Sequence, residues 1–144
     1  MGAGKTTYSK KLAQDTGATH LNIDEICMQK YTPAEYEKNW ELCFSQTLDS
    51  LWKDISTYMQ HGRDVIFDAG FWSRISRDEA AQKVKRLGGN PIIYYIYAPD
   101  EILKQRISSR SGEIAKHNLS HFDEIKKCFE EPTSPEIFIK INNF

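Results

Sequence analysis

The first residues of the chain have the types and spacing of the second half of a phosphate-binding loop. The chain begins MGAGKTT, and Gly4, Lys5 and Thr6 match the end of the pattern G-x-x-x-x-G-K-[ST]. In such a loop, backbone N–H groups hold phosphate oxygens, the lysine reaches the β- and γ-phosphates, and the hydroxyl binds Mg²⁺. We therefore expect Lys5 to be catalytic and Thr6 to bind a metal. The expected nucleotide-binding residues are Gly2, Ala3, Gly4, Lys5, Thr6 and Thr7.

A carboxylate follows the next apolar segment. Asp24 ends the stretch ATHLNID, which is a candidate strand. A carboxylate at the carboxyl edge of a strand, beside a phosphate loop, can accept the proton of an attacking hydroxyl. This places Asp24 as the expected catalytic base. The alternative is that Asp24 caps the short helix that follows.

A second carboxylate, Asp68, closes the apolar run VIFD. An apolar strand that ends in aspartate is typical of a residue that holds the hydration shell of Mg²⁺, although the same position can bind the acceptor substrate. Both roles stay open for Asp68. Arg74 and Arg77 follow in GFWSRISR, and we expect them to bind a polar or anionic acceptor. A solvated helix start is the alternative for both arginines.

Arg106 and Arg110 are four residues apart and precede a polar segment. On a helix this spacing puts both guanidinium groups on one face. Guanidinium groups are planar, bidentate and permanently charged, which suits phosphoryl oxygens. We expect catalytic arginines here, carried by a lid that closes over the γ-phosphate. Two arginines on an exposed helix face are the alternative.

Helices and strands alternate along the chain that must position these residues. Capping signals and apolar periodicity predict helices over residues 5–16, 32–61, 76–87, 100–110 and 120–129. Short apolar, β-branched or aromatic runs predict strands over residues 18–24, 64–70, 91–99 and 136–141. This alternation predicts an α/β fold with a parallel sheet, in one domain over residues 1–144. Ligands of such sheets bind at the carboxyl ends of the strands.

Composition limits the classes of partner. The 144 residues include 19 basic and 20 acidic side chains, with a net charge of -1, and apolar residues make up 40%. A near-neutral chain makes duplex nucleic acid or an anionic membrane a poor main partner. The three cysteines are scattered and form no C-x-x-C, which is typical of reduced thiols in the cytoplasm. We find no signal peptide and no apolar run of the length of a membrane span.

Six segments together resemble the AAA-33 group of P-loop kinases. They are GAGKTT, NIDE, VIFDAGFWSR with a further arginine, YYIYAP, RISSR and FEEPTSPE. The resemblance extends from Met1 to about Ile141. The group contains small kinases similar to zeta toxin and to chloramphenicol phosphotransferase, and it is more distantly similar to polynucleotide kinase.

The resemblance implies a P-loop NTPase fold of the nucleotide-kinase type, a three-layer sandwich around a parallel sheet. It implies ATP and Mg²⁺ as cofactors, and transfer of the γ-phosphoryl group to a hydroxyl of a small-molecule acceptor. By position, Lys5 and Thr6 would bind the nucleotide, Asp24 would be the base, and Arg106 or Arg110 would be the lid arginine. The matching residues Phe129, Pro132 and Glu136 would lie on the adenine side, with packing as the alternative.

The chain departs from the family at its beginning. Family members have an apolar strand and the first glycine of the loop before the position of Met1. We therefore expect the first central strand to be absent from this chain, with Met1 an internal methionine taken as a start. The competing expectation is that a partner chain or a rearranged strand fills the slot. Oligomeric state stays open, a homodimer included.

Two other functions stay open beside the small-molecule kinase. The first is a kinase of 5′-hydroxyl nucleic-acid ends, which needs a basic channel for a strand. The second is a nucleotide-binding module without catalysis. The sequence does not identify the acceptor.

Overall fold

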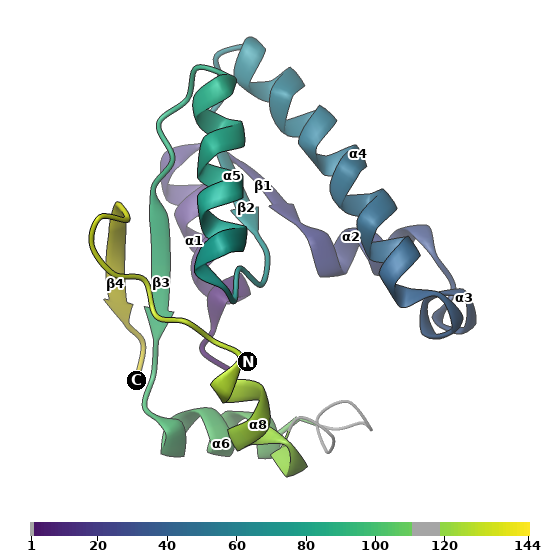
Figure 1. Ribbon diagram of the computed structural model, residues 1–144, viewed down its shortest axis with the longest axis vertical. Helices are drawn as coiled ribbons and strands as arrows, with labels where there is room; N and C mark the ends of the chain where they lie inside the picture. Colours follow the sequence, from purple (N-terminus) through teal and green to yellow (C-terminus); the bar gives the residue numbers. More distant parts are fainter. Residues whose placement is uncertain (1, 111–118) are drawn as a thin grey trace. The chain divides into compact units, whose positions relative to one another are not determined.

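The computed structural model describes residues 2–110 and 119–144, and Figure 1 shows their helices and strands. The chain forms two compact units. Unit 1 contains residues 1–5 and 71–144, and unit 2 contains residues 6–70. Unit 2 holds α1 (Lys5–Thr16, whose first residue belongs to unit 1), β1 (Thr19–Asn22), α2 (Ile23–Lys30), α3 (Pro33–Lys38), α4 (Trp40–Gln60) and β2 (Val65–Asp68). Unit 1 holds α5 (Arg74–Arg86), β3 (Ile93–Tyr97), α6 (Asp100–Ser108), α8 (Phe122–Lys127) and β4 (Phe138–Asn142).

Unit 2 is built on a parallel pair of strands. β1 and β2 run side by side from the pair Thr19 and Val65 to the pair Asn22 and Asp68. Side chains from β1, α2, α4 and β2 form one apolar core around Ile23, Cys27 and Leu51. Because the strands are parallel and in register, their last residues, both polar, lie next to each other at one edge.

Two helix boundaries in unit 2 differ from the sequence prediction. The capping box of Thr32 and Glu35 is confirmed, since each side chain bonds the backbone N–H of the other. The single helix predicted after it is two helices, because Asn39 adopts φ -141° and ψ 44° between α3 and α4. The strand predicted through Asp24 ends at Asn22, and Asp24 lies in the first turn of α2.

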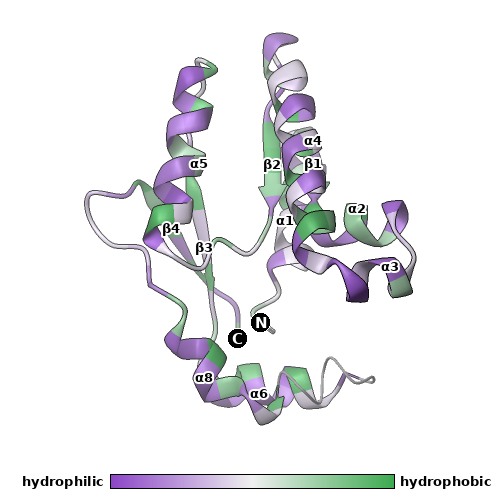
Figure 2. Ribbon diagram, turned by 45° about the vertical axis from the view of Figure 1, so that its right-hand side comes forward, coloured by the Kyte–Doolittle hydropathy of each residue, from purple (hydrophilic) through white to green (hydrophobic). Residues whose placement is uncertain are grey.

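Unit 1 contains the second parallel pair, β3 with β4, from the pair Ile93 and Phe138 to the pair Tyr97 and Asn142. The ring of Phe129 lies near these strands, with centroid distances of 5.6 Å to Tyr95 and 6.3 Å to Trp72. Phe129 is therefore part of the aromatic packing of this unit. In Figure 2, β2 is largely hydrophobic in colour, whereas α5 is largely hydrophilic, as expected for a helix with a solvated face.

Helix ends in unit 1 correct three details of the sequence prediction. The cap of α5 is Ser73, whose hydroxyl accepts from the N–H of Ser76 at 3.2 Å, so the helix begins earlier than a box at Ser76 predicts. The residue before α8 is His121, which makes no side-chain cap bond, so the predicted cap at Ser120 is wrong. α6 ends at Ser108.

Both ladders are parallel and alternate with helices along the chain, so the predicted α/β class is confirmed. The prediction of a single domain stays a prediction, as does that of an absent central strand. Within residues 2–110 and 119–144, no helix combines the length and apolar character needed to cross a membrane.

Candidate functional site

The glycine-rich loop of unit 1 depends on two glycines. Gly2 and Gly4 have φ of 70° and 84°, in the left-handed region that glycine adopts without a steric penalty. A Cβ on Gly4 would lie 2.4 Å from Asn143 Nδ2, and one on Gly2 would lie 3.1 Å from the carbonyl oxygen of Leu103. The backbone of the loop therefore packs so closely against Asn143 and Leu103 that a side chain at Gly4 or Gly2 would be crowded.

Asn143 holds this loop in place. Its Nδ2 donates to the carbonyl oxygen of Ala3 at 2.7 Å, and its N–H donates to the carbonyl oxygen of Tyr97 at 2.8 Å. Its own carbonyl oxygen accepts from Arg106 Nη1 at 2.9 Å. The loop, the end of β3 and a predicted catalytic arginine thus share one residue. Sequence reasoning missed Asn143, although a polar residue directly after the last strand is a usable signal.

The two predicted lid arginines differ in their surroundings. Arg106 is half-buried on α6 with its side chain on Asn143, whereas Arg110 is exposed and lies beyond the end of the helix. Their spacing predicted that the two side chains share one helical face, but Arg110 lies outside the helix. Most of the polar segment expected to form a lid, residues 111–118, lies outside the described residues.

Unit 2 contains a buried polar cluster, which we call the Asp68 cluster. Its members are Thr6, Ser9, His20, Asn22 and Asp68. Asn22 Nδ2 donates to Asp68 Oδ2 at 2.7 Å and to Thr6 Oγ1 at 3.3 Å. Ser9 Oγ donates to the same Asp68 oxygen at 3.0 Å, and His20 Nε2 lies 2.9 Å from Ser9 Oγ. Two residues predicted to hold Mg²⁺, Thr6 and Asp68, thus belong to one hydrogen-bonded group.

Sequence reasoning missed Ser9, His20 and Asn22. Ser9 lies one turn after Lys5 and Thr6 on α1, and His20 and Asn22 alternate with Leu21 along β1. Alternation along a strand puts both polar side chains on one face. Polar residues on a strand that is otherwise expected to be apolar were the available signal.

The Asp68 cluster fits a magnesium ion that is held partly by phosphate. Mg²⁺ prefers oxygen ligands and commonly takes one or two from the protein, with water and substrate phosphates as the rest. Thr6 and Asp68 offer a hydroxyl and a carboxylate close to one nitrogen. Among the described residues, no group of three or more His, Cys, Asp or Glu side chains could form a metal cage by itself. A Mg²⁺ ion at Thr6 and Asp68 would take its remaining ligands from water and from nucleotide phosphates.

Other predicted residues of unit 2 and of the loop lie as follows. Asp24 is exposed in the first turn of α2, and its helix is capped by Asn22 Oδ1, which accepts from the N–H of Glu25 at 2.8 Å. Lys5 is half-buried at the first position of α1, and Thr7 is exposed on the same helix. Asp24 thus keeps the exposure that a base for an external hydroxyl needs.

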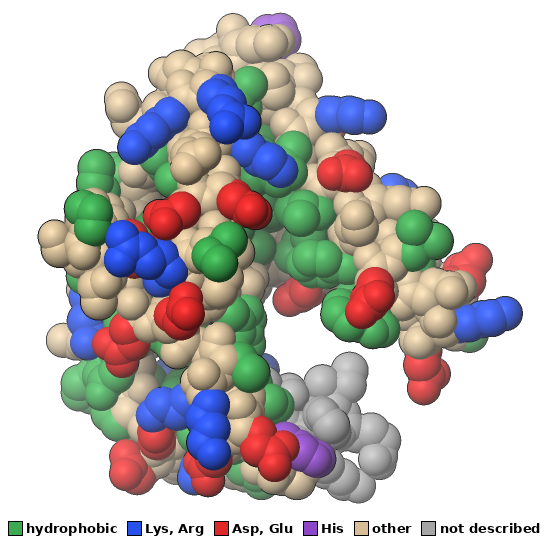
Figure 3. All heavy atoms as spheres, in the orientation of Figure 1, with side chains coloured by type: hydrophobic (Ala, Val, Ile, Leu, Met, Phe, Trp, Pro, Cys, Tyr) green, Lys and Arg blue, Asp and Glu red, His purple; other side chains and the backbone are tan. Residues whose placement is uncertain are grey.

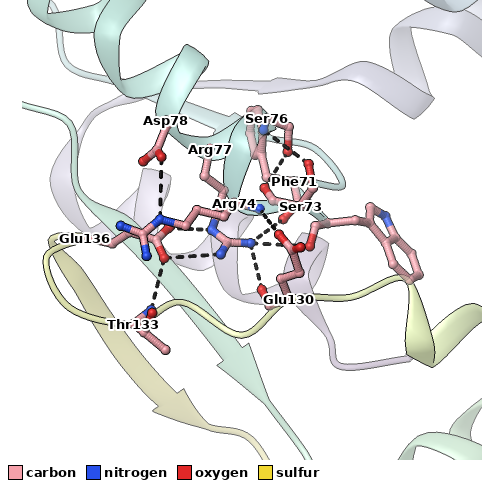
Figure 4. A network of polar contacts seen from close by, with 10 residues as sticks. Phe71, Ser73, Arg74, Ser76, Arg77, Asp78, Glu130, Thr133 and Glu136 are labelled. Atoms are coloured by element: carbon pink, nitrogen blue, oxygen red, sulfur yellow. Dashed lines mark hydrogen bonds and ion pairs between the residues drawn. The ribbon is translucent and has the colours of Figure 1, made fainter.

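Arg77 occupies a buried network in unit 1, shown in Figure 4. Its Nε donates to Glu136 Oε1 at 2.6 Å, and both side chains are 3% exposed. Its Nη1 donates to the carbonyl oxygens of Phe71, Trp72 and Glu130. The prediction that Arg77 binds an acceptor is therefore corrected, because its guanidinium holds together three segments of its own unit.

Glu136 belongs to the same network. The hydrogen bond from Arg77, with another from the N–H of Thr133, holds the pKa of the Glu136 carboxyl below its ordinary value despite burial. Of its two predicted roles, the packing role matches these contacts. Pro132, in the same segment, is buried as well.

Arg74 is the more accessible arginine of the pair. Its side chain is 41% exposed, and its Nε lies 3.5 Å from Oδ2 of Asp78, one helical turn further along α5. Its backbone N–H donates to the Glu130 carboxylate, also drawn in Figure 4. A surface ion pair of this kind is weak, so the guanidinium can exchange Asp78 for another anion. Acceptor binding by Arg74 stays a prediction.

The fold and the loop define an α/β protein of the P-loop type. The chain belongs to the family described as AAA domain, the AAA-33 group, which it matches over residues 1–132. The resemblance drawn from the sequence motifs is thereby confirmed.

Three solved structures are similar to this chain. A sugar kinase from Janibacter sp. HTCC2649 has a TM-score of 0.65 at 23% identity, over 98% of this chain and 79% of that one. A gluconokinase from Sinorhizobium meliloti 1021 has a TM-score of 0.67 at 15% identity, over 99% and 78%. A candidate kinase from Chloroflexus aurantiacus j-10-fl has a TM-score of 0.72 at 19% identity, over 97% and 79%. The predicted P-loop kinase fold is confirmed by these matches.

Proposed function

We propose that this chain is an ATP-dependent phosphotransferase that moves the γ-phosphoryl group to a hydroxyl of a small molecule. The observation that carries the proposal is the pairing of Thr6 and Asp68 through Asn22. Thr6 directly follows Lys5 in the sequence, so the lysine expected to bind phosphate and one of the two expected metal ligands are adjacent residues. This combination is what phosphoryl transfer requires.

Each residue has a distinct role in the proposal. Backbone N–H groups of residues 2–7 bind phosphate oxygens, and Lys5 neutralises charge on the β- and γ-phosphates. Thr6 and Asp68 hold Mg²⁺, which, when bound, neutralises charge on the transferring phosphoryl group. Asp24 accepts the proton of the acceptor hydroxyl. Arg106 or Arg110 stabilises the charge of the transition state.

The proposed acceptor class is a sugar or sugar acid. Two structures with this fold carry the names sugar kinase and gluconokinase, which supports testing such acceptors first. Figure 3 shows acidic and basic side chains interspersed over α5, unlike the single-sign stripe of nucleic-acid-binding surfaces. We also propose a cytoplasmic location, supported by the free thiols of Cys27, Cys43 and Cys128.

An acceptor screen tests the proposal. The 144-residue chain would be incubated with Mg²⁺ and ATP labelled on the γ-phosphate, with hexoses, gluconate, nucleosides, a 5′-hydroxyl oligonucleotide or no acceptor. We expect label on a sugar or sugar acid. Label on the oligonucleotide would favour the end-kinase alternative, and ATP binding without transfer to any acceptor would favour the non-catalytic module.

Lys5→Ala is the decisive variant for the loop. Losing the lysine charge at the transferring phosphoryl group should lower turnover by about 10²–10³-fold. Lys11→Ala is the matched control, because Lys11 is exposed on the same helix. Turnover that survives Lys5→Ala would contradict the assignment of the loop.

Asp24→Asn tests the base. Removing a general base should lower kcat by about 10²–10⁴-fold, with little change in KM for ATP. Glu25→Gln is the matched control, because the neighbouring carboxylate pairs with Lys10 at the surface. Equal losses in both variants would show that the first turn of α2 matters only as structure.

A further inference from the structure

Asn22 connects three parts of unit 2 with one side chain. Its Oδ1 accepts from the N–H of Glu25 at 2.8 Å and so caps α2. Its Nδ2 donates to Asp68 at 2.7 Å and to Thr6 at 3.3 Å. Because the cap needs an acceptor, the amide has one orientation only, with its NH₂ group facing Asp68 and Thr6. The residue is 6% exposed, so water competes little for these bonds.

The two N–H bonds fix the spacing of two oxygens. An amide NH₂ has two donors, and here one goes to a carboxylate and the other to a hydroxyl. Both oxygens therefore lie within 3.3 Å of a single nitrogen. The bonds from Asn22 and Ser9 both end on Asp68 Oδ2. Among the described residues, no hydrogen bond ends on Asp68 Oδ1, which leaves that oxygen for a ligand from outside the chain.

We propose that Asn22 is a positioning residue that sets the spacing of Thr6 and Asp68 as Mg²⁺ ligands and, through its cap, the place of Asp24. This assignment rests on the proposed function. Residues that hold metal ligands by hydrogen bonds typically change metal affinity by about 10–100-fold when they are replaced.

Asparagine is the side chain that meets all three requirements. Serine caps a helix well but is too short to span to Asp68 and Thr6 as well. Aspartate keeps the cap acceptor but would face the Asp68 carboxylate with an oxygen in place of a donor. Glutamine is one methylene longer than the residues that cap helices.

The test compares nucleotide affinity with and without Mg²⁺. Calorimetry would measure the Kd of the full chain for the ATP analogue AMP-PNP, in MgCl₂ and in EDTA, for wild type and Asn22→Ser. Serine keeps the cap of α2 and so guards against a folding defect, which thermal unfolding would check. We expect Asn22→Ser to weaken binding about tenfold in MgCl₂ and to leave binding in EDTA unchanged.

Thr32→Ala is the matched control for loss of a cap. Thr32 caps α3 in the same unit and has no bond to the Asp68 cluster among those described. This variant should lower the unfolding temperature but leave the ratio of the two Kd values unchanged.

Four outcomes would overturn the assignment. If Asn22→Ser has wild-type affinity in both buffers, or loses equal affinity in both, Asn22 is only a structural residue while the proposed function stands. If wild type binds AMP-PNP no better in MgCl₂ than in EDTA, Thr6 and Asp68 are not metal ligands. If wild type binds no nucleotide in either buffer, the proposed function falls and the role of Asn22 falls with it.

Discussion

Within the described residues, both units have a buried carboxylate beside a pair of parallel strands, but the two carboxylates are compensated differently. In unit 1, Glu136 pairs with the guanidinium of Arg77. In unit 2, Asp68 accepts from the neutral side chains of Ser9 and Asn22, and within the described residues no lysine or arginine pairs with it. The side chains of Glu136 and Asp68 are 3% and 4% exposed, so burial alone does not separate them.

We propose that this difference separates a structural carboxylate, Glu136, from a functional one, Asp68. A buried charge is costly unless it is paired or coordinates a metal. Glu136 already has its cation, and its bonds join segments of its own unit. Asp68 has neutral donors that fix its position, and within the described residues no lysine or arginine pairs with it, which supports the proposed Mg²⁺ site. The Nε2 atom of His20 lies 3.7 Å from Asp68 Oδ2.

The largest expected effect on stability is that of Arg77→Met. Removing one partner of a buried ion pair leaves the other charge unpaired and typically costs about 3–5 kcal/mol. Urea unfolding followed by circular dichroism would measure the loss. Arg86→Met is the control, because Arg86 lies exposed on the same helix. A loss no larger than that of the control would contradict the structural role of Arg77.

A smaller effect is expected for Ser9→Ala. The change removes one of two neutral donors to Asp68, so the free energy of unfolding should fall by about 1–2 kcal/mol. Ser76→Ala is the comparison in unit 1, since that hydroxyl donates to the backbone carbonyl of Ser73. If both variants lose equally little, Ser9 does not support the Asp68 carboxylate. The same urea titrations would show this.

The mildest effect is a pH dependence in unit 1. The hydrogen bond from Arg77 lowers the pKa of Glu136, so the unfolded chain takes up this proton more readily than the folded one. The stability from the pair is fully present above the ordinary glutamate pKa of about 4.3 and is lost as pH falls through the lower folded value. Urea unfolding between pH 6 and pH 3 should show this decline, and Glu136→Gln should flatten it. An equally steep decline in Glu136→Gln would assign the effect to other carboxylates.

Local signals were enough to predict most of the elements and the family. The strands, the capping box of Thr32 and Glu35, and the glycine that ends α1 follow from turn chemistry and apolar runs, which act over a few residues. The set of motifs was enough to predict the fold, because phosphate loops and strand-end carboxylates occur at fixed places in α/β proteins. Helix breaks were harder, since Asn39 interrupts an apolar stripe that continues on both sides of it.

Sequence reasoning misjudged the roles of residues whose partners lie far away in the sequence. Arg77 has the composition of a ligand-binding arginine, and only its pairing with Glu136, which is 59 residues away, shows it to be structural. Asn22 and Ser9 attracted no functional prediction, because the register of β1 with β2 is what puts them beside Asp68. Amino-acid type alone does not tell a compensated charge from an uncompensated one.

The most direct test of the account is Asp68→Asn, which removes the charge and keeps the shape. We predict that its free energy of unfolding stays within about 1 kcal/mol of wild type, because neutral donors serve an amide oxygen as well. We also predict that AMP-PNP affinity in MgCl₂ falls at least about tenfold, with binding in EDTA unchanged. A variant that unfolds more easily by about 3 kcal/mol or more, yet keeps its Mg²⁺-dependent affinity, would make Asp68 a structural residue like Glu136 and contradict the proposed site.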